Sequence, residues 1–102
     1  MITEKITMPQ ASNCGMGWGR LEGIQNKSLK EVLEFIKENF KTWGTCSILD
    51  KSDHTVIRKF DYDLYNNNIF YYHLAGWELD QKIHKVKFSF CFMSRDIIIE
   101  VE

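Results

Sequence analysis

Residues 28–43 read SLKEVLEFIKENFKTW and carry the strongest helical pattern in the chain. Apolar residues recur there at the three- and four-residue spacing that lines one side of an α-helix: Leu29, Val32, Leu33, Ile36, Phe40 and Trp43. Ser28 followed by Glu31 predicts a capping box, in which each side chain binds a backbone N–H of the first turn. Gly44 is expected to end the helix in a left-handed conformation. Such an apolar stripe needs a partner surface, and we expect a sheet.

The residues after this helix predict strands. Residues 45–50 and 55–60 flank the turn-forming residues 51–54 and predict a hairpin. Residues 69–74 predict a third strand, which continues through Trp77 if Gly76 marks a bulge. The clearest alternation is at the C-terminal end, where apolar residues recur at every second position in 86–92 and again in 97–102. Residues 2–8 predict a short edge strand.

These elements predict an α+β fold, with one N-terminal helix packed on a roughly five-stranded antiparallel meander sheet. We expect a single domain over residues 1–102, with a Gly-rich N-terminal arm (1–27), a helix (28–43) and an antiparallel sheet (45–102). This order of elements is similar to that of cystatin-like folds. The Q-x-V-x-G loop of cystatins has no counterpart at residues 51–54. Their second loop carries Pro-Trp, and the only proline here is Pro9. The similarity therefore implies a topology and no cystatin function.

Charge and cysteine usage narrow the function classes. The formal net charge of -1 argues against a strongly basic nucleic-acid binder. The three cysteines, Cys14, Cys46 and Cys91, show no paired spacing, which predicts free thiols in a reducing compartment. We find no signal-peptide pattern and no apolar run of membrane-spanning length. We therefore expect a cytoplasmic protein without membrane contact.

The sequence contains no catalytic signature, and we assign no catalytic residue. Cys14 is the one thiol whose position suggests reactivity, because it lies in the Gly-rich segment 13–19; His73 or His84 would be its base. A small enzyme that uses Cys14 as a nucleophile therefore stays as an alternative. The histidines and cysteines lack the spacing of a structural zinc site, so we expect no metal and no cofactor. The glycines follow no predicted strand, which argues against a phosphate-binding loop.

The sheet face turned away from the helix is the more informative surface. Strand alternation places aromatic, aliphatic and cationic side chains there, and the predicted interface consists of Ile69, Tyr71, Lys87, Met93 and Ile98, with Trp18 as an anchor in the arm. The sequence therefore predicts a small protein-interaction module. It is expected to self-associate as a homodimer or to bind an unknown protein partner.

The same face allows a second interpretation, RNA or single-stranded nucleic-acid binding. Tyr71, Tyr72 or Trp77 would stack on bases, and the phosphates would be bound by Arg58, Lys59, Lys82, Lys85 and Lys87. The net charge, together with Glu100 and Glu102 on the neighbouring strand, weighs against it.

Overall fold

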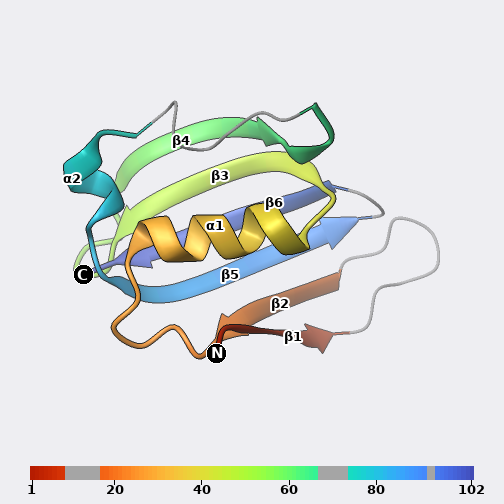
Figure 1. Ribbon diagram of the computed structural model, residues 1–102, viewed down its shortest axis with the longest axis horizontal. Helices are drawn as coiled ribbons and strands as arrows, with labels where there is room; N and C mark the ends of the chain where they lie inside the picture. The colour runs from red at the N-terminus through yellow and green to blue at the C-terminus, as the bar shows by residue number, and fades with distance from the viewer. Residues whose placement is uncertain (9–16, 67–73, 92–93) are drawn as a thin grey trace.

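A computed structural model describes residues 1–8, 17–66, 74–91 and 94–102. One helix, α1 (Leu29–Asn39), lies on one face of a curved six-stranded sheet (Figure 1). The strands are β1 (Thr3–Met8), β2 (Gly17–Glu22), β3 (Trp43–Asp50), β4 (Val56–Asp63), β5 (Ile83–Cys91) and β6 (Ser94–Val101). A short helix, α2 (Gly76–Leu79), precedes β5, and a 3₁₀ turn follows β4 at Leu64–Asn66. Neither described helix is long and apolar enough to cross a membrane.

The strand order is β1-β2-β5-β6-β3-β4, and β3 pairs with β6 in parallel while the other pairs are antiparallel. These directions make β2 parallel to β3, and α1 connects the two strands as a crossover with β5 and β6 between them. The predicted N-terminal helix on an antiparallel meander is therefore wrong. Two strands precede the helix, and the sheet is mixed. The cystatin-like order fails for the same reason.

The missed strand is β2, which lies in the segment expected to be an arm. Two of its three inward positions are glycines and only Leu21 is apolar, so the apolar alternation that marks a strand is nearly absent there. Gly19 is required by close packing: a Cβ atom would lie 2.5 Å from the carbonyl oxygen of Lys5 and 2.9 Å from Cζ of Phe88. The Phe88 ring therefore occupies the space above β2 that a side chain would fill. The edge strand expected at residues 2–8 is confirmed as β1.

The capping box at the start of α1 is confirmed. The Glu31 backbone N–H donates to Ser28 Oγ at 3.3 Å, and the Ser28 N–H donates to Glu31 Oε1 at 3.1 Å. The predicted stop at Gly44 is wrong, because α1 ends at Asn39 and Gly44 lies inside β3. A Cβ atom at Gly44 would lie 2.1 Å from the carbonyl oxygen of Arg95. Gly44 thus allows β3 and β6 to approach each other closely. Trp43, which was expected on the apolar side of the helix, is instead an exposed residue of β3.

The core lies between α1 and the sheet. It consists of the helix residues Leu29, Val32, Leu33 and Ile36, of Phe40 just after the helix, and of strand residues that include Cys46, Ile48, Val86, Phe88, Ile97, Ile99 and Val101. Phe40 meets Phe88 edge to face, with ring centroids 5.6 Å apart. The Arg95 guanidinium lies 4.2 Å from the Phe40 ring centroid and pairs with Glu4 at 2.8 Å. This ion pair connects edge strand β1 to central strand β6.

α2 is held against β4 by a buried carboxylate. Arg58 donates to Glu78 through Nε at 2.8 Å and Nη2 at 3.2 Å, and the Ala75 N–H donates to Glu78 Oε1 at 3.0 Å. Trp77 belongs to this helix, so the predicted extension of the third strand through Trp77 is wrong. The third strand itself, expected at 69–74, lies outside the described residues except for Leu74.

Candidate functional site: the outer face of the sheet

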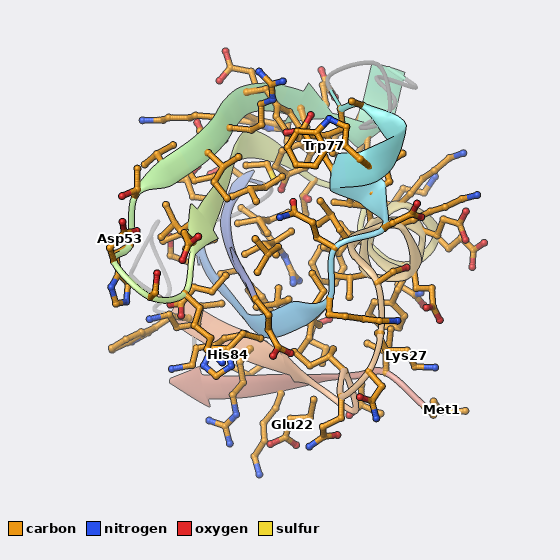
Figure 2. All side chains as sticks on the ribbon, turned by 90° about the vertical axis from the view of Figure 1, so that its left-hand side faces the viewer. Met1, Glu22, Lys27, Asp53, Trp77 and His84 are labelled. Carbon is orange, nitrogen blue, oxygen red and sulfur yellow. The ribbon has the colours of Figure 1, made fainter. Side chains whose placement is uncertain are left out.

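We call the sheet surface opposite α1 the outer face. Alternate strand residues point into the core or out onto this face, as the buried and exposed positions of β2 show. Figure 2 shows Glu22 and His84 extending from the sheet away from the interior. The part of the outer face that carries the argument comprises Lys5, Trp18, Arg20, Thr45, Ser47, Lys59, Asp61, Lys87, Ser89, Asp96 and Ile98.

A row of cations crosses the outer face perpendicular to the strands. Strand register places Lys5 beside Arg20, Arg20 beside Lys87, and Lys87 beside Ile98; the row continues through Ser47 to Lys59. We call Lys5, Arg20, Lys87 and Lys59 the basic row. Neighbouring strands lie about 4.8 Å apart, so the first three cations are closely spaced. Arg20 is already paired on this face, with its Nη2 3.0 Å from Glu22 Oε2, whereas Lys87 lies at the centre of the row. Ile98, with 39% of its surface exposed, lies near the middle of the row.

The next row along the strands carries the opposite charge. Register places Trp18 beside Ser89, Ser89 beside Asp96, and Thr45 beside Asp61. Asp96 Oδ1 accepts the Thr45 backbone N–H at 3.1 Å, which places Asp96 beside Thr45 as well. We call Asp96 and Asp61 the acidic row. A hollow of about 440 Å³ adjoins it, lined by Trp43, Gly44, Thr45, Asp61, Tyr62, Asp63, Ser94 and Asp96.

The structure brings three predicted interface residues onto this face. Lys87 and Ile98 are direct cross-strand partners, and Trp18 lies on the next strand, 51% exposed. The other three predicted residues, Ile69, Tyr71 and Met93, lie outside the described residues. Lys5, Arg20 and Asp96 also lie on this face and were not predicted from the sequence. Asp96 precedes the alternation expected at residues 97–102, and the structure places it two residues before Ile98 at an outward position of β6.

The described residues of the nucleic-acid interpretation do not all share one surface. Lys59, Lys85 and Lys87 are exposed strand residues that point away from the core. Arg58 lies opposite the buried Ile48 on the α1 side of the sheet, where it pairs with Glu78. Trp77 lies in α2, and Lys82 precedes β5, with its Nζ 3.5 Å from the Asn26 carbonyl oxygen. Tyr71 and Tyr72 lie outside the described residues.

The catalytic alternative gains no support from the described side chains. Cys14 and His73 lie outside them, and His84 is exposed on β5. Burial raises the pKa of the Cys46 thiol to about 12, so this cysteine is not a thiolate at neutral pH. Within the described residues, no three His, Cys, Asp or Glu side chains gather closely enough to hold a metal ion.

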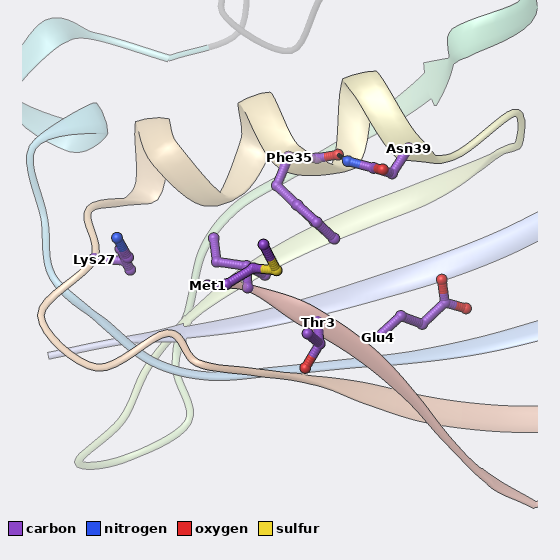
Figure 3. Close-up of a pocket in the computed structure, with 7 residues that line it drawn as sticks. Met1, Thr3, Glu4, Lys27, Phe35 and Asn39 are labelled. Carbon is purple, nitrogen blue, oxygen red and sulfur yellow. Dashed lines mark hydrogen bonds between the residues drawn. The ribbon is translucent and has the colours of Figure 1, made fainter.

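A second hollow, of about 680 Å³, lies between β1 and α1 (Figure 3). Its lining is Met1, Ile2, Thr3, Glu4, Lys27, Phe35 and Asn39. Three of its polar side chains already have partners in the chain. Lys27 Nζ lies 3.7 Å from Glu31 Oε2, and Glu4 forms an ion pair with Arg95. Asn39 Nδ2 donates to the Phe35 carbonyl oxygen at 2.9 Å. We therefore base the functional proposal on the outer face and not on this hollow.

No family model, curated protein or solved structure matches this chain. A function is therefore inferred from the surfaces of the molecule. Among those surfaces, the outer face combines an exposed aromatic residue, an exposed aliphatic residue and ordered charges of both signs.

Proposed function

We propose that the chain is a protein-interaction module that binds through the outer face and has no catalytic role. The observation that supports this proposal is the position of Ile98, an exposed aliphatic side chain beside Lys87 and Ser47. Trp18 lies on the same face two strands away, in the adjacent row, and charged residues flank both. An apolar centre with an aromatic anchor and a polar rim is typical of protein interfaces.

The charge pattern favours a protein partner over a nucleic acid. A phosphate backbone bound along the basic row would pass beside Asp96 and Asp61, whose carboxylates repel it. A protein can present charges of both signs and match both rows. We also place the module in the cytoplasm, which is consistent with a buried, free thiol at Cys46.

Site-specific photo-crosslinking in the cells from which the sequence comes tests this proposal. One variant carries a photoreactive benzophenone amino acid in place of Ser89, on the outer face between Trp18 and Asp96. The matched control carries it in place of Glu38, an exposed residue of α1. The proposal predicts a discrete protein adduct from position 89 and none of the same size from position 38.

Two results would contradict the proposal. One is an equal adduct pattern from both positions, or no adduct from either, since the outer face would then make no specific protein contact. The other is an adduct from position 89 that nuclease removes, which would establish the nucleic-acid interpretation. The mass of a protein adduct also identifies its partner as this chain or another.

A further inference from the structure

The charges of the outer face favour one kind of partner. We infer that the partner is a second copy of this chain, packed face to face through the outer face, with Lys87 of each copy against Asp96 of the other. This inference rests on the proposed function, because it names the partner of that surface. It follows from two observations: the face carries a cationic and an anionic row, and the two rows are adjacent.

A two-fold axis determines which residues meet in such a dimer. If the axis runs parallel to the rows and between them, the basic row of one copy lies over the acidic row of the other. Lys87 then faces the region of Ser89 and Asp96 in the second copy. A lysine side chain is long enough to reach a carboxylate one strand away. The contact is isologous, so each dimer contains this pair twice.

The alternative axis is electrostatically unfavourable. If the two-fold axis runs parallel to the strands, each row lies over the same row of the second copy. Cations of the basic row then face cations, and Asp96 and Asp61 face carboxylates. Like charges placed directly opposite destabilise a contact. Charge complementarity therefore selects the axis parallel to the rows, with Ile98 near the centre of the contact.

Sedimentation equilibrium of the full chain and its charge variants tests the inference. The parent protein is expected to approach twice its 12.1 kDa mass as concentration rises. Lys87→Glu is expected to raise the dimer dissociation constant about tenfold or more, because two attractive pairs become repulsive. Lys30→Glu, the same charge change on the exposed side of α1, should leave the dissociation constant unchanged.

Two further variants test the pairing itself. Lys87→Glu combined with Asp96→Lys reverses both charges, so the double variant should recover most of the association that Lys87→Glu loses. Asp96→Asn removes the charge but keeps an oxygen that accepts the Thr45 N–H. It is expected to weaken the dimer and to make it less sensitive to salt. If the double variant does not fold, Asp96→Asn decides the question.

The inference is overturned if the parent stays at 12.1 kDa at every concentration, or if Lys87→Glu and Asp96→Asn associate as the parent does. A folded double variant that stays as weak as Lys87→Glu would also overturn it. A monomeric parent that still gives an adduct with another protein from position 89 rejects only the second copy as partner. A monomeric parent with no adduct rejects the proposed function as well.

Discussion

Lys87 and Asp96 are diagonal neighbours on the outer face, because Asp96 is the cross-strand partner of Ser89, two residues along β5 from Lys87. The two side chains thus bring the basic and acidic rows side by side at the middle of the sheet. Ile98 lies in the same cluster, directly across from Lys87. A cation, an anion and an exposed aliphatic residue at one place make this cluster the expected centre of the contact.

The first prediction concerns the apolar centre. Ile98→Thr keeps a β-branched side chain but is expected to weaken self-association about tenfold. Each copy exchanges a buried ethyl group for a hydroxyl, and so loses at least the contribution of one methylene group, about 0.8 kcal/mol. Ile6→Thr is the matched control, since Ile6 is 44% exposed but points to the α1 side of β1. Sedimentation of both variants checks the prediction, and equal effects of the two changes would contradict it.

A second prediction concerns the contact between β3 and β6. Gly44→Ala is expected to lower the free energy of unfolding by more than about 1 kcal/mol, because the new Cβ would collide with the backbone of Arg95. Gly76→Ala is the control, since no atom lies within 4 Å of a Cβ placed there. That change should alter stability by about 0.5 kcal/mol or less. Urea unfolding measures both, and equal midpoints for the two variants would count against the described strand contact.

The aromatic cluster under the end of α1 gives a third prediction. Phe88 is 2% exposed, touches Phe40 and fills the space above Gly19. Phe88→Ala is expected to cost about 3–5 kcal/mol, because the cavity is closed in by Phe40 and Arg95. Phe35→Ala, at a partly buried position, should cost less. Denaturant unfolding checks the order, and an unchanged midpoint for Phe88→Ala would show that the ring is not in the core.

The fourth prediction concerns the pH dependence of stability. Hydrogen bonds from Arg58 hold the pKa of Glu78 below its usual value of 4.5. A lowered pKa in the folded state means that the ionised carboxylate stabilises the fold at pH values above 4.5. This contribution is lost as the pH falls from 4.5 through the lowered pKa of the folded state. Glu78→Gln should therefore melt at a lower temperature than the parent at neutral pH. The difference should narrow in acid.

Thermal melts of the parent and of Glu78→Gln across the acidic range provide the test. Arg58→Met should reproduce the lowered melting temperature at neutral pH, since it leaves the buried carboxylate without its guanidinium partner. A melting-temperature difference that stays constant from neutral pH into acid would show that the Glu78 charge does not contribute.

Local patterns in the sequence predicted the helix and the strands in which apolar side chains recur at regular spacing. The capping box at Ser28 and the apolar spacing of α1 identify the helix, because both depend on neighbours in the same turns. Alternation likewise identifies β5 and β6. β2 was missed because Gly17 and Gly19 carry no side chain at its inward positions. The assignment of Gly44 as a helix stop failed because its contact is with Arg95, far along the chain.

The candidate site depends on strand order, which local patterns do not contain. Alternation alone predicted that Lys87 and Ile98 point outward. The basic row, however, is assembled from Lys5, Arg20, Lys87 and Lys59, which become neighbours only through the mixed pairing of six strands. The antiparallel meander placed these strands in a different order. The two adjacent charged rows were therefore not visible in the sequence.

The most direct test is a pair of ¹⁵N–¹H correlation spectra of the unmodified protein, one at low and one at high concentration. The account predicts concentration-dependent shifts confined to the outer face: the amides of Lys87, Ser89, Asp96 and Ile98 and the indole N–H of Trp18. The amides of α1 should not move. Spectra that do not change with concentration, or shifts that map to α1 and to the hollow beside β1, would contradict the account.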